Sequence, residues 1–148
     1  GDPSTLSLRR RRVLVEVNVH APLDLAQSVL PAMLERGEGW IVNVSSGTAR
    51  PVPGPPFGQS PGAVSMTSYG ASKAALNRVS NGLAAELWGS GVRVNAVEPR
   101  AAVLTEGAGA LVGSSLRPEQ IESLEEMVEA VAWLCQCAPD HTGGSRVN

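Results

Sequence analysis

Hydrophobic positions along this 148-residue chain change their spacing several times, and each change predicts an element. Residues 13–34 begin with alternating valines, as a strand would, and continue with apolar residues at helical spacing. We read this stretch as a helix, while a strand stays open for the part before Asn18. The β-branched run at 41–45 predicts a buried parallel strand. Tyr69 to Trp88 has helical spacing again, and 92–97 predicts a second strand.

A third helix is expected to open near Pro118, with one face toward the core and one toward water. The residues expected inward are Ile121, Leu124, Val128, Val131 and Cys135, and those expected outward are Glu119, Glu122, Glu125, Glu126 and Glu129. Before the second helix, residues 47–68 carry many prolines and glycines, which predicts a long loop. Strands and helices that alternate with short connections indicate an α/β fold with a parallel sheet and flanking helices. So few parallel strands leave unpaired edges, and we therefore expect residues 1–148 to be part of a larger domain.

Composition and charge narrow the function classes. The net charge of −2 gives no reason to expect a nucleic-acid partner, and we interpret the run Arg9 to Arg12 as a solvated helix face. The 18% of charged residues is low against about 25% in typical proteins, which favours a well-covered surface, as an oligomer would have. His20 and His141 are far apart and the two cysteines, Cys135 and Cys137, look like reduced thiols, so we expect no metal. With no signal-peptide or membrane-spanning stretch in the sequence, we expect a cytoplasmic protein without a membrane partner.

The segment SYGASKAAL at 68–76 carries the main candidate chemistry. Tyr69 and Lys73 are four residues apart and therefore project from one face of the predicted helix. Tyrosine alone is a poor acid or base at neutral pH, and a lysine ammonium a few ångströms away favours its phenolate. This spacing suits proton transfer to or from a hydroxyl or carbonyl group. By itself, a surface tyrosine near a surface lysine would be the simpler interpretation.

Motifs on both sides of this segment support the chemical interpretation. Ser45 and Ser46 end the first predicted strand, where their hydroxyls could reach a substrate oxygen beyond the sheet edge. In chain order the sequence contains Asn18, PAM at 31–33, GWIVNVSS at 39–46, YGASKAA at 69–75, LAAEL at 83–87 and RVNAVEP at 93–99. This series resembles the short-chain dehydrogenase/reductase family over roughly residues 13–144, in its carbonyl/alcohol branch. The resemblance is to the C-terminal half, because the family's T-G-x-x-x-G-x-G and N-N-A-G segments are not in the sequence.

The resemblance implies a partial Rossmann-like fold, with 1–148 as the C-terminal part of one NAD(P)-binding domain. It implies an oxidoreductase that interconverts a ketone and a secondary alcohol, and it implies four catalytic residues. Tyr69 would be the general acid or base, and Lys73 would assist it and bind the nicotinamide ribose. Ser46 would hold the substrate carbonyl, and Asn18 would hold a water that links Lys73 to solvent.

The same resemblance implies a cofactor, NAD or NADP, with the choice between them open. Its contacts would come from Tyr69, Lys73, Pro99, Val103 and Thr105. Two departures from the family pattern are a proline-rich segment at 50–61 that looks like an insertion, and Arg100 in place of the usual glycine after Pro99.

Partners and an alternative function follow from the same comparison. The implied partners are a small carbonyl or alcohol substrate and further copies of the chain, as a homodimer or homotetramer. The alternative is a truncated or degenerate, non-catalytic member that acts as an oligomerisation module, with close approach permitted by small residues such as Ala71, Ala75, Gly82 and Ala85.

Pro22 raises one more question, because a proline lacks the N–H that a helix would direct to the carbonyl of Asn18. Two outcomes are open. The helix is kinked with the Asn18 carbonyl free and facing Lys73, or Pro22 merely bends the helix or occupies its first turn.

Overall fold

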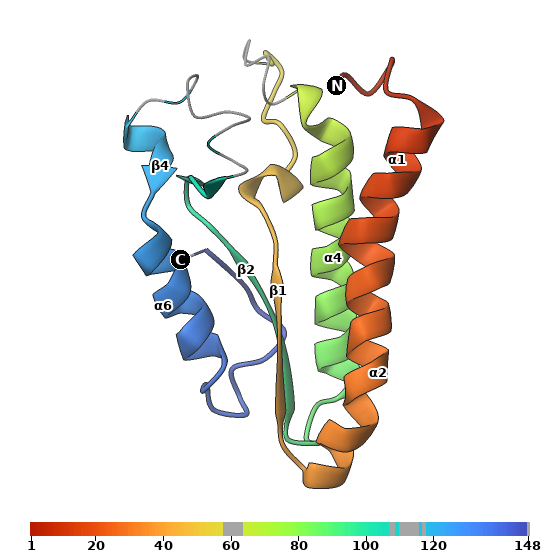
Figure 1. Cartoon of the computed structure of the whole chain (residues 1–148), viewed down its shortest axis with the longest axis vertical. Helices are drawn as coiled ribbons and strands as arrows, with labels where there is room; N and C mark the ends of the chain where they lie inside the picture. The colour runs from red at the N-terminus through yellow and green to blue at the C-terminus, as the bar shows by residue number, and fades with distance from the viewer. Residues whose placement is uncertain (58–63, 107–108, 110–115, 117, 148) are drawn as a thin grey trace.

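The main sheet consists of three parallel strands among the residues that the computed structural model describes, which are 1–148 without 58–63, 107–108, 110–115, 117 and 148 (Figure 1). The strands lie in the order β1-β2-β5, and they are β1 (Gly39–Val44), β2 (Val92–Glu98) and β5 (Ser145–Val147). In the register, Gly39 is opposite Val92 and Ala96 is opposite Ser145. A second, two-stranded parallel pair joins β3 (Ala102–Val103) to β4 (Ile121–Glu122). The predicted α/β class with a parallel sheet is confirmed.

The N-terminal region forms one long helical segment. Ser7 caps α1 (Leu8–Val15) by accepting a hydrogen bond from the Arg10 N–H. A π-helical segment, η1 (Glu16–His20), follows and leads directly into α2 (Ala21–Arg36). The helix interpretation is therefore right on both sides of Asn18, and it extends to Leu8. The irregularity lies at Asn18 itself, and Pro22 lies in the first turn of α2.

Helices cover both faces of the sheet. α2 and α4 (Thr67–Glu86) lie on one face, and α6 (Leu124–Leu134) lies on the other (Figure 1). Each face has its own apolar cluster, as alternate residues of a strand point to opposite sides. Toward α2 and α4 the buried members are Ala84, Leu87, Val92 and Val94. Toward α6 they are Val97, Met127 and Leu134.

The interpretation of the third helix needs correction. The helix begins at Leu124, after a 3-10 turn η4 (Pro118–Gln120) and strand β4. Its buried residues are Met127 and Leu134, whereas Leu124 is 52% and Val128 56% exposed. Cys135 is exposed and Ile121 belongs to β4 rather than to the helix, while Val131 does pack against the core. The segment is apolar on more than one face, and packing against Val97 selects a face that spacing alone leaves open.

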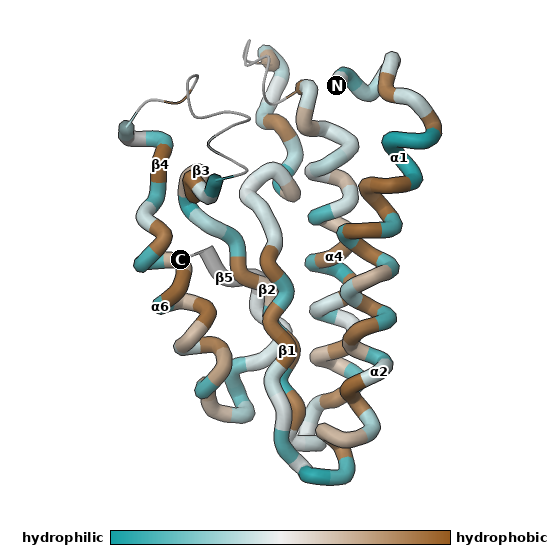
Figure 2. The backbone as a smooth tube through the Cα atoms, in the orientation of Figure 1, coloured by the Kyte–Doolittle hydropathy of each residue, from teal (hydrophilic) through white to brown (hydrophobic). Residues whose placement is uncertain are grey.

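The hydropathy of the backbone matches this layered arrangement. In β1 and β2, as in α1 and α2, hydrophobic positions are interrupted by hydrophilic ones (Figure 2). Among the described residues, no helix combines the length and the apolarity that crossing a membrane requires.

Candidate active site

The candidate site begins where β1 ends. The Ser45 N–H donates to the carbonyl of Val97 at 2.7 Å, which extends the pairing with β2 by one residue. Ser46 then caps a short 3-10 turn, η2 (Gly47–Ala49), and its hydroxyl accepts hydrogen bonds from the Thr48 N–H at 3.3 Å and the Thr48 hydroxyl at 2.9 Å. The carboxyl end of the strand thus presents two serines, with Ser45 buried and Ser46 half-buried.

Close packing brings α4 against this turn. Gly70, in the first turn of α4, is buried, and a Cβ built there would lie 2.2 Å from the Thr48 carbonyl oxygen. Such a separation is far inside van der Waals contact, so only glycine permits this approach of helix to turn. Because Tyr69 is adjacent to Gly70, the contact fixes the tyrosine beside the end of β1.

Tyr69 and Lys73 are one turn apart on α4, as their spacing predicts. The Lys73 ammonium lies 5.7 Å from the centre of the Tyr69 ring and donates a hydrogen bond of 2.8 Å to the Val44 carbonyl. Burial lowers the pKa of Lys73 from its ordinary value, because the half-buried ammonium loses hydration. Lys73 therefore connects α4 to the last residue of β1, whereas Gly70 packs against the turn that follows.

Asn18 reaches the same turn of α4 from the π-helical segment. Its side-chain amide donates to the Ser72 hydroxyl at 3.0 Å, and that hydroxyl donates to the Tyr69 carbonyl at 2.7 Å. The amide of Asn18 thus binds Ser72, the neighbour of Lys73 in the sequence, and not Lys73 itself. The π-helical turn sends the Ala21 N–H to the Glu16 carbonyl, five residues earlier, and Pro22 has no N–H to donate to the Asn18 carbonyl.

A cavity of about 950 Å³ joins several of the predicted site residues. Ser45, Ser46 and Tyr69 line one part of it, and residues 99–103 line another. Of the expected cofactor contacts, Pro99 and Val103 belong to the lining, whereas Thr105 does not. Asn18 and Lys73 also lie outside the lining, although both are bonded to the elements that form it.

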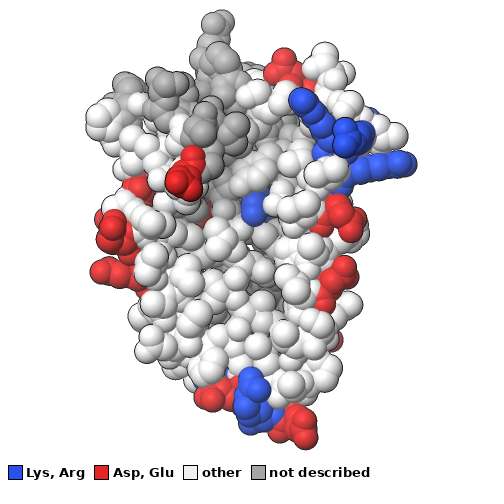
Figure 3. All heavy atoms as spheres, in the orientation of Figure 1, with Lys and Arg blue, Asp and Glu red and all other residues white. Residues whose placement is uncertain are grey.

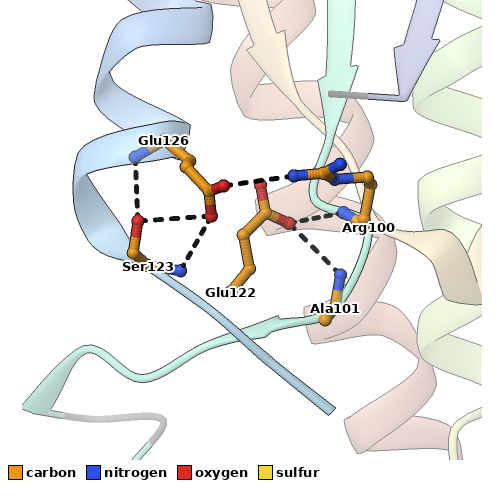
Figure 4. A network of polar contacts seen from close by, with 5 residues as sticks. All are labelled: Arg100, Ala101, Glu122, Ser123 and Glu126. Atoms are coloured by element: carbon orange, nitrogen blue, oxygen red, sulfur yellow. Dashed lines mark hydrogen bonds and ion pairs between the residues drawn. The ribbon is translucent and has the colours of Figure 1, made fainter. Parts of the chain in front are cut away.

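A carboxylate network that was not predicted holds the wall formed by residues 99–103 (Figure 4). Glu122 is only 5% exposed, and one of its oxygens accepts from the N–H groups of Arg100 at 2.6 Å and Ala101 at 3.2 Å. The Arg100 guanidinium pairs with Glu126 at 3.2 Å. Glu126 also forms a capping box with Ser123 at the start of α6. The expectation of a wet helix face is therefore wrong for Glu122, which is buried and precedes the helix, whereas Glu126 is exposed on α6 as expected.

A sequence signal for this network exists. Ser123 and Glu126 have the S-x-x-E spacing of a capping box, which places the helix start at Leu124 and leaves Glu122 outside the helix. With the helix start at Leu124, Glu122 no longer belongs to the outward face of the helix. Nothing in the sequence says which backbone groups its carboxylate binds, because they lie 21 and 22 residues away.

Comparisons with known proteins agree with this arrangement. A short chain dehydrogenase of Pseudocercospora fijiensis is 37% identical over 117 residues, which are 78% of this chain and 34% of that protein. The fold also matches a solved short chain dehydrogenase/reductase family protein with a TM-score of 0.80 and 29% identity, over 99% of this chain and 59% of the other. A 4-hydroxyisoleucine dehydrogenase complexed with NADH matches with a TM-score of 0.74 and 25% identity, over 99% and 61%.

These proportions mean that the chain spans about a third of the curated relative and three fifths of the solved ones. The structural matches confirm the partial Rossmann-like fold. The sequence model of the short chain dehydrogenase family matches residues 2–113, and the chain therefore belongs to that family.

Proposed function

We propose that residues 1–148 are the C-terminal part of a single NAD(P)-binding domain, in an oxidoreductase that interconverts a ketone and a secondary alcohol. One observation carries the proposal. Ser46 and Tyr69 are 23 residues apart in the sequence and line the same cavity, at the carboxyl ends of parallel strands. Ligands of open parallel sheets bind at this edge.

Ser46 is suited to hold the substrate carbonyl. Its hydroxyl oxygen accepts two hydrogen bonds from Thr48, which leaves its own proton to be donated. The Thr48 contacts also fix the direction of the side chain. A substrate carbonyl in the cavity would receive this proton as a hydrogen bond, and the bond strengthens as negative charge develops on the oxygen.

Tyr69 would move the proton. During reduction its hydroxyl donates to the carbonyl oxygen, and during oxidation its phenolate accepts the alcohol proton. The ammonium of Lys73, 5.7 Å from the ring centre, stabilises that phenolate by its charge. Lys73 would also bind the ribose of the cofactor, in exchange for its present bond to Val44.

The residues present fit the nicotinamide end of NAD or NADP. A cavity of about 950 Å³ is at the upper end of the roughly 300–1,000 Å³ of small-molecule sites, so it has room for more than a small ketone. Pro99 and Val103 offer an apolar wall, and Thr105, two residues beyond Val103, would be a further contact. When bound, the nicotinamide supplies or accepts the hydride.

Asn18 completes the proposed proton path. The π-helical turn and Pro22 together disturb the hydrogen bonding around its carbonyl, and its amide is held by Ser72, next to Lys73. A water on the Asn18 carbonyl would connect Lys73 to solvent, so that Tyr69 can be reprotonated after each turnover.

Replacing Tyr69 with Phe tests the proposal. We expect kcat to fall by about 10²- to 10⁴-fold, because the ring remains while the proton donor is lost. Steady-state reduction of small ketones with NADH and with NADPH gives this number, and nicotinamide fluorescence checks that cofactor binding is retained. A Tyr69→Phe enzyme with undiminished turnover would refute the assignment.

A second candidate is the oligomerisation module. Large apolar side chains are exposed along the outer face of the N-terminal helical segment, with Val17 at 59%, Leu25 at 67% and Val29 at 42%. Such a stripe fits contact with another copy of the chain, as homodimer or homotetramer. Titration with NADH and NADPH, combined with sedimentation, separates the two functions. A dimer without saturable cofactor binding would favour the module.

A further inference from the structure

The cavity lining carries positive charge that the proposed reaction does not use. Arg9 and Arg10, in the first turn of α1, line the cavity together with Arg100, which follows β2. Within the part of the chain that the structure describes, the lining contains no aspartate or glutamate. Lys and Arg side chains gather on this face over α1 (Figure 3). A ligand in the cavity therefore meets guanidinium groups, and of these only that of Arg100 is paired with a described carboxylate, Glu126.

The three arginines differ in their pairing. Arg100 is bound to Glu126 at 3.2 Å. Among described side chains, Arg9 and Arg10 have no ion-pair partner. Their guanidinium groups are thus available for a carboxylate or phosphate, which they bind with short, charge-assisted hydrogen bonds.

Helix geometry divides the basic run into two pairs. Arg9 and Arg10 share the cavity side of α1 with Val13 and Leu14, four residues further on. Arg11 and Arg12 line a separate hollow with Glu16 and His20. All four arginines are exposed, as a solvated face implies, and half of the run also faces the proposed site.

An independent observation also indicates a ligand. Ser45 is 4% exposed and lines the same cavity, and its hydroxyl has no hydrogen-bond partner among the residues that the structure describes. A buried hydroxyl without a partner costs about 1–3 kcal/mol, so such groups are rare unless a ligand or water completes them. Ser45 is available to hydrogen-bond an oxygen of whatever enters.

We propose that the substrate carries an anionic group, namely the carboxylate of a small oxo or hydroxy acid, and that Arg9 and Arg10 bind it. This inference rests on the proposed function, since it assumes that the reacting oxygen is held by Ser46 and Tyr69 in the same cavity. Ser45 hydrogen-bonds a substrate oxygen between the two ends. The two arginines then select acids over neutral ketones.

Matched pairs of acids and esters test this selection in the full chain. Pyruvate, acetoacetate and levulinate are compared with their methyl esters, which keep the ketone and remove the charge. NMR titration of the amides of α1 and Ser45 gives the dissociation constants without any need for turnover. We expect at least one acid to bind about 10-fold or more tightly than its ester, as charge-assisted bonds of this kind contribute to affinity.

The arginine pairs supply the control. In Arg9→Gln/Arg10→Gln, the preference for the acid should disappear, whereas Arg11→Gln/Arg12→Gln removes the same charge outside the cavity and should keep it. Ser45→Ala should weaken acid and ester by the same factor. The inference is overturned if no acid is preferred, or if both double variants lose the preference alike, which would mean general attraction of anions.

Two further outcomes distinguish substrate binding by the arginines from cofactor binding, and the anion site from the proposed reaction. If the Arg9→Gln/Arg10→Gln variant binds NADH more weakly but keeps the acid preference, the arginines serve the cofactor and the inference is wrong. If acids bind selectively and no ketone is reduced, the anion site stands while the proposed reaction fails.

Discussion

Two walls of the cavity are built in different ways. The wall that carries Ser46 and Tyr69 is held by backbone approach, with Gly70 against the Thr48 carbonyl and Lys73 on the Val44 carbonyl. The wall of residues 99–103 is held by the side chain of Glu122, which binds two of its N–H groups. The first wall depends on backbone carbonyls of a strand end and a turn that α4 approaches closely, and the second depends on one buried carboxylate.

This difference predicts different responses to substitution. At the first wall the Gly70 position is packed directly against the Thr48 backbone. Backbone atoms cannot rotate away as a side chain can, so an added methyl group there must displace the helix or the turn. A side-chain carboxylate can be replaced with partial retention of its bonds. We therefore expect the largest effects at the first wall and graded effects at the second.

Gly70→Ala should give the largest loss. Its Cβ would lie 2.2 Å from the Thr48 carbonyl oxygen, so α4 or the turn must shift. We expect the free energy of unfolding to fall by about 1–3 kcal/mol, together with loss of the contacts that orient Tyr69. Urea unfolding measures the stability, and ligand titration measures the site.

Gly82→Ala is the matched control on the same helix. The nearest atom to its Cβ is the Arg78 Nη1 at 3.4 Å, the end of a flexible side chain. Alanine is the better helix former, so we expect stabilisation by ~0.5–1 kcal/mol. A stabilisation at Gly70 equal to that at Gly82 would mean that helix propensity, and not the close contact, governs Gly70.

Glu122→Gln should have the next largest effect. The amide retains one oxygen but loses the charge that two N–H groups share, and a buried unsatisfied group costs about 1–3 kcal/mol. The amide resonances of Arg100 and Ala101 should shift, because both N–H groups lose a charged acceptor. In the exposed Glu129→Gln control, stability should change by less than about 0.5 kcal/mol. Unchanged resonances would contradict the bonding that we describe.

Ser123→Ala should cost about 1 kcal/mol, as removal of an N-cap usually does. Ser123 accepts the Glu126 N–H at 3.1 Å within a capping box, whereas Ser7, the N-cap of α1, accepts the Arg10 N–H at 3.4 Å without one. Ser7→Ala is therefore expected to cost less, because it removes a single weak bond. Thermal unfolding of the two variants compares them, and the reverse order would exclude the capping box as the stronger element.

The distance along the chain over which each feature is determined explains what the sequence could predict. The strands at 41–45 and 92–97 and the helix from Tyr69 follow from local periodicity, and Tyr69 with Lys73 follows from helical spacing. These signals lie within a few residues of one another. Glu122 and the unpaired Ser45 hydroxyl depend on contacts between distant segments, which no local pattern encodes.

The face of α6 shows the same limit. Leu124, Val128 and Met127 are all apolar, so periodicity allowed more than one inward face. The tertiary contact of Met127 with Val97 decides between them. The π-helical turn at Asn18 was predictable only in part. Pro22 indicates an irregularity in the helix, but the hydrogen bonds that Asn18 makes depend on packing against α4.

The smallest expected effect is a pH dependence at the first wall. Burial lowers the pKa of Lys73 in the folded chain, so above that pKa the unfolded chain binds more protons at this residue than the folded one. The contribution of Lys73 to stability must then rise with pH until the ordinary lysine pKa of about 10.4 is passed. Lys73→Met removes the titrating group and keeps an apolar stem. The free energy of unfolding of the native chain relative to Lys73→Met, measured in urea at pH 8, 9 and 10, should therefore increase with pH, and a difference that falls would show that Lys73 keeps its charge more readily in the folded chain.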